Sequence, residues 1–403
     1  MEFSLSYHEN LADSGCALHF LHNQRSDSQI DLILIALEKG DILFYNQKSG
    51  KLLLEYSLEC KTEVWCVESI YEDENVFKLF LGAASGTIYA FIVNIESTEL
   101  GDYCVKVDDL WKNTAKEMIS KMDLYDVDKD GKDELLVSSL DNSFWVLNPI
   151  DGAFIWGQVF PSGITKFTCG DINNDGNIEV IIGDNLGNLR IFHGSDGNMI
   201  SFTKLRKTIR VIEIIPIPRT IKEKSVETDS RNILAVGNDE CRLYFIDPFS
   251  AEILSFLTLN TYIWHSMKNT ELILDKHRNE KESLLISTYS FSFMEGLVLN
   301  QDNVTPELIF YDLDDWNIIK KINDINIQCF SSPLVINSTD YLALGTTDKK
   351  IHLLNLKNGE IEQSLTTGGI VNSVLLVEIR GINYLLFCDD DKNFNCYHLF
   401  SQK

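Results

Sequence analysis

The chain has 403 residues, of which 44% are hydrophobic and 24% are charged, a balance that is ordinary for a soluble folded protein. Its 60 acidic and 35 basic residues give a formal net charge of −25. This charge argues against nucleic acid or anionic membrane surfaces as partners, because both are bound through clustered lysine and arginine. The N-terminus does not resemble a secretory signal, and no apolar run reaches the roughly 18 residues of a transmembrane helix. We therefore expect a cytoplasmic protein with protein partners and no membrane insertion.

One unit recurs along the whole chain: an apolar strand, a tight turn, and a second strand that ends in aromatic or aliphatic residues. Period-two alternation of β-branched and aromatic residues favours strands, and the turns consist of Gly, Asp, Asn or Ser, which tolerate hairpin dihedrals. An irregular copy lies between Leu284 and Asp312, which makes eight hairpins. The seven regular hairpins are predicted at 31–46, 78–92, 134–148, 179–193, 232–247, 341–355 and 384–400.

Two further strands flank each predicted hairpin. An apolar stretch precedes it, and a turn followed by another apolar run comes after it. The glycines of two such turns, Gly152 and Gly197, lie 45 residues apart. Four strands in roughly 45–65 residues is the period of one propeller blade.

The sequence thus predicts an all-β protein, a single closed β-propeller over residues 1–403. Eight blades are expected, or seven if the irregular unit is an insertion. The last unit, 368–400, ends after three strands, and the N-terminal segment 2–8 is predicted to complete it, which would remove free sheet edges. Loop insertions are predicted at about 217–230 and 271–304.

Two adjacent units carry the same acidic loop, Asp126–Glu134 and Asp171–Glu179, each directly before a predicted strand. Both loops read D-x-(D/N)-x-D-G-x-x-E and lie 45 residues apart, at the same place in their units. Oxygen ligands at alternate positions can converge on a hard cation such as Ca²⁺, and the glycine permits the sharp turn. The loops are not EF-hands, because their twelfth positions are the apolar residues Val137 and Ile182.

These loops and the strands after them resemble the FG-GAP or VCBS repeats known from the propellers of integrin α-subunits. The resemblance implies up to two structural Ca²⁺ ions, with Mg²⁺ or an empty site where calcium is scarce. The remaining units resemble quinoprotein-type propeller repeats more loosely, through their (S/D)-G-x-x-x-(W/F/Y) endings. An alternative for the acidic loops is a pair of ion-free Asx turns whose acids bond backbone amides. The ligands implied by the resemblance are Asp126, Asp128, Asp130, Glu134, Asp171, Asn173, Asp175 and Glu179.

The other chemistry-bearing residues form no catalytic constellation. The eight histidines are scattered, and no H-E-x-x-H, G-x-S-x-G, Walker or G-x-G-x-x-G motif occurs. We predict that the nine cysteines are reduced core residues and that the tryptophans pack between blades. The acidic run Asp389–Asp391 is predicted to be a solvated turn, which could meet a basic partner.

A repeat scaffold of this kind favours a non-enzymatic function, as a cytosolic propeller subunit or adaptor of a multiprotein complex. An alternative is a sensor or regulatory subunit in which calcium or another ligand at the blade loops alters partner binding. A propeller enzyme is disfavoured. Quinoprotein dehydrogenases are exported and carry an adjacent cysteine pair, and this sequence shows neither a secretory signal nor such a pair.

Overall fold

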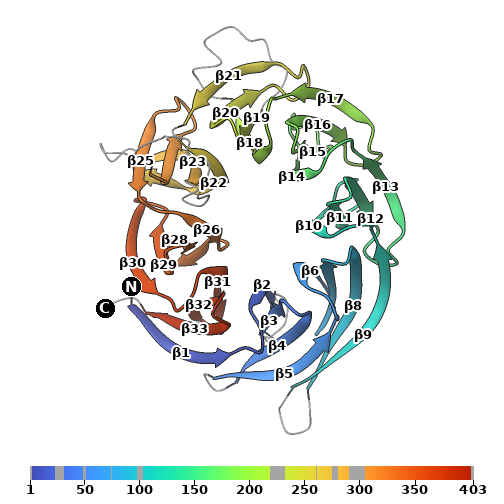
Figure 1. Cartoon of the computed structure of the whole chain (residues 1–403), viewed down its shortest axis with the longest axis vertical. Helices are drawn as coiled ribbons and strands as arrows, with labels where there is room; N and C mark the ends of the chain where they lie inside the picture. The colour runs from blue at the N-terminus through green and yellow to red at the C-terminus, as the bar shows by residue number, and fades with distance from the viewer. Residues whose placement is uncertain are drawn as a thin grey trace, which may run out of the picture.

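The computed structural model describes residues 2–22, 31–48, 51–73, 75–97, 103–217, 232–259, 261–274, 280–289 and 305–400. Within these ranges every regular element is a β-strand, and the strands form eight antiparallel sheets. The sheets stand as blades in a ring around a common centre (Figure 1). The chain is an eight-bladed β-propeller, which confirms the predicted fold class and the larger of the two blade numbers.

The first four blades follow one another along the chain, with four consecutive strands each. Blade one contains β2 (Gly15–His22), β3 (Asp31–Leu37), β4 (Asp41–Lys48) and β5 (Lys51–Glu59). Blade two contains β6 (Val64–Asp73), β7 (Val76–Ala83), β8 (Thr87–Ser97) and β9 (Tyr103–Thr114). Blade three contains β10 (Ile119–Tyr125), β11 (Glu134–Ser139), β12 (Ser143–Leu147) and β13 (Phe154–Val159). Blade four contains β14 (Ile164–Gly170), β15 (Glu179–Asp184), β16 (Asn188–His193) and β17 (Met199–Lys204).

The second half of the ring is built in the same way and ends in a shared blade. Blade five contains β18 (Ile209–Pro216), β19 (Asn232–Asn238), β20 (Arg242–Ile246) and β21 (Ile253–Thr258). Blade six contains β22 (Tyr262–Leu274), β23 (Glu280–Tyr289), β24 (Glu307–Asp312) and β25 (Ile318–Asn323). Blade seven contains β26 (Ile327–Phe330), β28 (Thr339–Thr346), β29 (Lys350–Asn355) and β30 (Glu360–Thr366), with the short β27 (Leu334–Ile336) paired to β28. Blade eight contains β31 (Val371–Ile379), β32 (Ile382–Asp389), β33 (Asn393–Phe400) and β1 (Glu2–Asn10).

The position of a strand within its blade decides its composition. The first strand of each blade lies nearest the centre of the ring and the fourth lies at the rim (Figure 1). The second strand is covered by the neighbouring blades on both faces, so β11 and β15 are buried at every residue. Because successive strands run antiparallel, the loops after the first and third strands of a blade emerge on the same face of the ring.

The N-terminal strand closes the ring, as the sequence predicts. β1 pairs antiparallel with β33, from Glu2 opposite Phe400 to Asn10 opposite Asn393. The closure also reaches the first blade, because the hydroxyl of Tyr45 on β4 donates a hydrogen bond of 2.8 Å to Glu9. The N-terminal strand β1 thus belongs to the last blade and also contacts the first blade, so it joins the two.

The predicted insertions are only partly described by the structure. β22 and β23 extend to a pair between Leu274 and Glu280, so the span predicted as an insertion at 271–304 contains regular strand. Residues 275–279 and 290–304, and all of the 217–230 prediction except Ile217, lie outside the described residues.

Tryptophans on the rim strands lock neighbouring blades together. The indole of Trp156 on β13 faces Gly197 in the next blade, and its Nε1 donates a hydrogen bond of 2.6 Å to the carbonyl of Gly194. Trp111 faces Gly152 in the same way and donates to the carbonyl of Pro149 at 3.1 Å. These contacts confirm the predicted packing between blades for both side chains.

Two other expectations for single side chains are wrong. Trp65 is 47% exposed, because it lies at the start of an inner strand rather than between two rim strands. Cys104 is exposed, although the other seven cysteines described are buried or half-buried, as predicted. Among the described residues there is no helix with the length and apolar character needed to cross a membrane.

Replacing Gly197 with alanine tests the contact between blades three and four. Gly197 has a φ of +69°, and a Cβ atom there would lie 2.5 Å from the Trp156 ring. The left-handed backbone and the overlap together should lower the free energy of unfolding by about 3 kcal/mol. The measurement is chemical denaturation followed by circular dichroism.

Gly381→Ala is the matched control, because Gly381 has a φ of +75° but open space around a Cβ. Only the backbone cost of about 1 kcal/mol is expected there. Equal losses in the two variants would show that the Trp156 contact does not limit the stability of the ring.

Candidate metal centre

The two acidic loops occupy equivalent places in adjacent blades. The first joins β10 to β11 in blade three, and the second joins β14 to β15 in blade four. Both end at a glutamate, Glu134 or Glu179, that is the first residue of the second strand. The repeat therefore places both loops on the same face of the ring.

The backbone takes the same course in both loops. The residue before the third acid, Lys129 or Asn174, has a positive φ of 64° or 59°. The glycine after that acid, Gly131 or Gly176, has a φ of 88° or 92°. No heavy atom lies within 4 Å of a Cβ placed on either glycine, so the turn itself and not packing requires glycine here.

Three carboxylates converge in the first loop. Asp126, Asp128 and Asp130 each place an oxygen within 4.8 Å of the other two. Backbone amides hold them in place, since the Gly131 amide donates to Asp126 at 3.1 Å and the Lys132 amide donates to Asp130 at 2.8 Å. The second oxygen of Asp126, Oδ1, is buried and has no hydrogen-bond partner. An unpaired buried carboxylate oxygen is costly, and a cation would satisfy it.

The glutamate at the end of each loop is buried and hydrogen-bonded to the loop backbone. Glu134 is 6% exposed and Glu179 is 1% exposed, and each accepts a backbone hydrogen bond of 2.9 Å, from Val127 or Ile172. Burial raises the pKa of Glu134 to about 7. The hydrogen bond from the Val127 amide opposes this shift, and the negative charges of the nearby aspartates add to it. Burial likewise raises the pKa of Glu179. A divalent cation among these acids would oppose both shifts, because opposite charge favours the ionised carboxylate.

The second loop is closer to saturation by its own amides. Asp171 accepts hydrogen bonds on both oxygens, from the amides of Asp175 and Gly176 at 3.1 and 2.9 Å. The side-chain amide of Asn173 donates to Asp175 at 2.8 Å. Of the predicted ligands, Asp126, Asp128 and Asp130 of the first loop form a three-carboxylate cluster, and the acids of the second loop form no such cluster.

The donor set fits a hard divalent cation better than a transition metal. All the side-chain donors are oxygen atoms of carboxylates or an amide, the ligands that Ca²⁺ and Mg²⁺ prefer. The first loop keeps a free, enclosed oxygen for such an ion. The second would need Asn173 to turn its amide away from Asp175.

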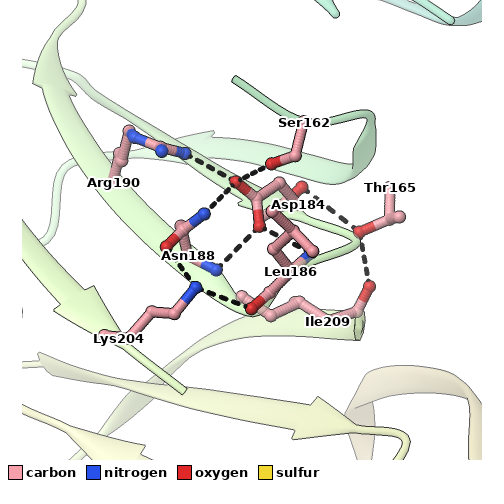
Figure 2. A network of polar contacts seen from close by, with 9 residues as sticks. Ser162, Thr165, Asp184, Leu186, Asn188, Arg190, Lys204 and Ile209 are labelled. Carbon is pink, nitrogen blue, oxygen red and sulfur yellow. Dashed lines mark hydrogen bonds and ion pairs between the residues drawn. The ribbon is translucent and has the colours of Figure 1, made fainter. Parts of the chain in front are cut away.

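A different acidic residue, Asp184, shows what a purely structural carboxylate looks like in this fold. It is fully buried at the end of β15 and lies at the centre of a polar network (Figure 2). Its oxygens accept from Ser162 at 2.5 Å, from the amide and side chain of Asn188 at 2.7 and 2.6 Å, and from Arg190 at 2.9 Å. With a further bond from the Leu186 amide, no lone pair remains for a cation.

This network was not predicted, and the prediction for its counterpart in blade eight is wrong. Asp389 was predicted to lie in a solvated turn, but it is fully buried and accepts hydrogen bonds from Asn393 and the Gly369 amide. Only its neighbours Asp390 and Asp391 are exposed. The signal was an aspartate followed four residues later by asparagine, which occurs at Asp184 and Asn188 as well.

Eight blades, the last of them completed by the N-terminal strand β1, form a closed β-propeller with two acidic loops on one face. No protein-family profile matches the chain, and comparison with curated proteins finds no relative. The FG-GAP resemblance therefore rests on the two loops alone.

Solved structures share the fold over the whole chain. Sqt1 from Saccharomyces cerevisiae aligns with a TM-score of 0.67 and 13% identity over 100% of both chains. Sqt1 from Chaetomium thermophilum, bound to the N-terminus of the ribosomal protein L10, aligns with a TM-score of 0.67 and 12% identity over 99% of this chain and 100% of its own. BamB from Moraxella catarrhalis aligns with a TM-score of 0.56 and 13% identity over 99% and 100%. At such identities the comparison establishes the fold alone.

Proposed function

We propose that the protein is a non-enzymatic interaction scaffold, a propeller subunit or adaptor of a protein complex, and that calcium ions brace the acidic loops of blades three and four. The observation that carries the calcium assignment is the convergence of carboxylate oxygens from Asp126, Asp128 and Asp130, together with the buried, unpaired Oδ1 of Asp126. Asp126, Asp128, Asp130 and Glu134 would hold one ion. Asp171, Asn173, Asp175 and Glu179 would hold a second, weaker one.

The scaffold assignment is supported by propellers solved with protein partners. Besides the complex of Sqt1 with the L10 N-terminus, BBS1N was solved in complex with ARL6DN, and it aligns with this chain at a TM-score of 0.51 and 11% identity. A rigid ring that presents loops on two faces is suited to such binding. The −25 net charge favours a basic partner.

The ions would serve as structural supports rather than catalysts. All ligands of a site come from one nine-residue loop, and the glutamate is already held by a backbone amide. This arrangement leaves few coordination positions for a substrate. Calcium would supply a positive charge that ties the end of the inner strand to the start of the second strand.

Calcium is expected to raise the thermal midpoint of unfolding by several degrees, and a chelator should reverse the effect. An ion that binds only the folded chain adds about 2.7 kcal/mol when its concentration is 100 times Kd. Asp126→Asn should remove most of this gain, because it neutralises the acid with the unpaired oxygen. The measurement is differential scanning calorimetry with and without calcium.

Asp151→Asn is the charge-matched control, because Asp151 is an exposed turn acid in the same blade and on the same face. It should keep the full response to calcium. If calcium and chelator leave the midpoint of the unaltered chain unchanged, the loops are ion-free Asx turns.

The scaffold function is tested by affinity purification of the full chain under several lysis conditions, with mass spectrometry of what co-purifies. Each candidate partner is then produced alone and mixed with the pure propeller in size-exclusion chromatography. A stoichiometric complex is expected. Recovery of the propeller alone under all conditions would contradict the proposal, and dependence of the complex on calcium would favour a sensor.

A further inference from the structure

One glycine, Gly194, contacts both acidic loops. The turn His193–Asn198, which joins β16 to β17 and is called here the β16–β17 turn, lies between the loop of blade three and the loop of blade four. Its Gly194 is buried, and a Cβ atom there would lie 2.6 Å from the carbonyl oxygen of Val127 and 2.7 Å from that of Ile178. Val127 belongs to the first loop and Ile178 to the second.

Contacts in this junction connect Gly194 with the glutamate of each loop. On one side, the Val127 amide donates to Glu134, and the Val127 carbonyl abuts Gly194. On the other side, the Gly194 amide donates a hydrogen bond of 2.7 Å to the carbonyl of Ile178, the residue before Glu179. The series of contacts runs from Glu134 through Val127, Gly194 and Ile178 to Glu179, so three residues lie between the two glutamates.

The junction is buried and hydrogen-bonded. The Gly194 carbonyl accepts the 2.6 Å hydrogen bond from Trp156, so the turn is fixed to blade three as well as to its own blade. Val127 and Ile178 are 2% and 3% exposed and belong to the same apolar cluster as Trp156. Both loops and the turn also wall a pocket of about 240 Å³.

We propose that the two ion sites are coupled through Gly194, so that an ion in one loop strengthens binding in the other. The inference rests on the proposed calcium function. An ion in the first loop fixes Glu134 and Val127, and Val127 then fixes Gly194 and the residue before Glu179. The second loop is ordered before its own ion arrives, which reduces the conformational entropy lost on binding.

The test compares calcium affinities by isothermal titration calorimetry in the full chain and in variants with one loop inactivated. Asp126→Asn leaves the second loop, and Asp171→Asn leaves the first. The product of the two association constants of the unaltered chain should exceed the product of the two single-loop constants by at least about fivefold. Because coupling is reciprocal, either substitution should weaken the other loop by the same factor.

Two variants test the route. Gly194→Ala should collide with both carbonyls, and Trp156→Phe removes the hydrogen bond to Gly194 while it keeps an aromatic ring. In each, both loops should still bind calcium, but the coupling factor should fall towards one. Circular dichroism checks that the variants are folded, and Trp156→Phe remains informative if Gly194→Ala does not fold.

The control separates contact from charge. Asp151→Asn removes one negative charge from the same face without touching either loop, and titration in about 0.5 M KCl shortens the range of charge effects to a few ångströms. The coupling should survive both conditions.

The outcomes are distinct. If the unaltered chain binds no calcium, the proposed calcium function fails. If it binds calcium with a coupling factor of one, the loops are independent and only the present inference is overturned. If the coupling persists in both Gly194→Ala and Trp156→Phe, the route through the β16–β17 turn is wrong.

Discussion

Deletion of residues 2–10 is expected to abolish cooperative folding of the whole ring. Without β1, the strand β33 keeps an unpaired edge of backbone donors and acceptors along its length. Blade eight also loses the Phe3 contact with Tyr397, and Tyr45 of blade one loses Glu9. Because a folded domain is stable by only about 5–15 kcal/mol, this loss should remove the thermal transition. Calorimetry should show no cooperative unfolding, and size-exclusion chromatography should show aggregates.

A circular permutant provides the control for this deletion. Glu2 pairs with Phe400, so residues 1–10 can be attached after Lys403, and the new chain can begin at Leu11. The permutant contains every residue of the natural chain and should unfold cooperatively near the natural midpoint. If the deleted chain behaved like the permutant, ring closure by β1 would contribute little to stability.

Replacement of Asp184 with alanine should cost about 3–5 kcal/mol of unfolding free energy, the largest effect expected for a single side chain here. The change leaves the guanidinium of Arg190 without its carboxylate in a site where its side chain is 11% exposed. It also leaves Ser162 and Asn188 without their acceptor. Urea denaturation measures the loss.

Asp389→Ala is the matched comparison, because Asp389 is equally buried and accepts similar bonds but forms no ion pair with a described residue. Its loss should be smaller, about 1–3 kcal/mol. The difference between the two variants reports the contribution of Arg190. A loss at Asp184 no greater than that at Asp389 would contradict the importance of the ion pair.

The same network predicts a dependence of stability on pH. Burial alone would raise the pKa of Asp184, but the hydrogen bonds from Ser162, Asn188 and Arg190 outweigh it and lower that pKa. The contribution of this carboxylate is therefore complete above the unfolded pKa of about 3.9 and is lost as the pH falls through the folded value. Asp184→Asn should flatten the acid limb of the stability profile, whereas Asp151→Asn should leave it unchanged.

Local patterns in the sequence were sufficient to predict the hairpins and the ring. Alternation of apolar residues and turn chemistry act over a few residues, so the eight hairpins could be located, including the one between Leu284 and Asp312. The closing strand was predictable because the last unit lacked a fourth strand. Part of blade six was predicted as loop, because β23 begins with the charged residues Glu280, Lys281 and Glu282, which do not show the apolar pattern of a strand.

The acidic loops were also legible in the sequence, because all their predicted ligands lie within nine residues. Which carboxylate oxygens lack a hydrogen-bond partner could not be predicted from the sequence. Asp126 keeps a free oxygen while Asp171 does not, although at the predicted ligand positions the loops differ only by Asn173 in place of Asp128. The Asp175 amide donates to Asp171 as well as to Asn173, whereas the Asp130 amide donates to Asp128.

By itself, the sequence determined the strand repeat, the closure of the ring and the position of the two acidic loops, because each depends on neighbouring residues or on a regular period. Only the tertiary structure decided which residues of different blades meet. Trp156 and Gly194 are 38 residues apart in the chain, yet their contact fixes the junction between the loops. Side chains that meet across a blade interface do so because the sheets twist and stack, and no local pattern records that arrangement.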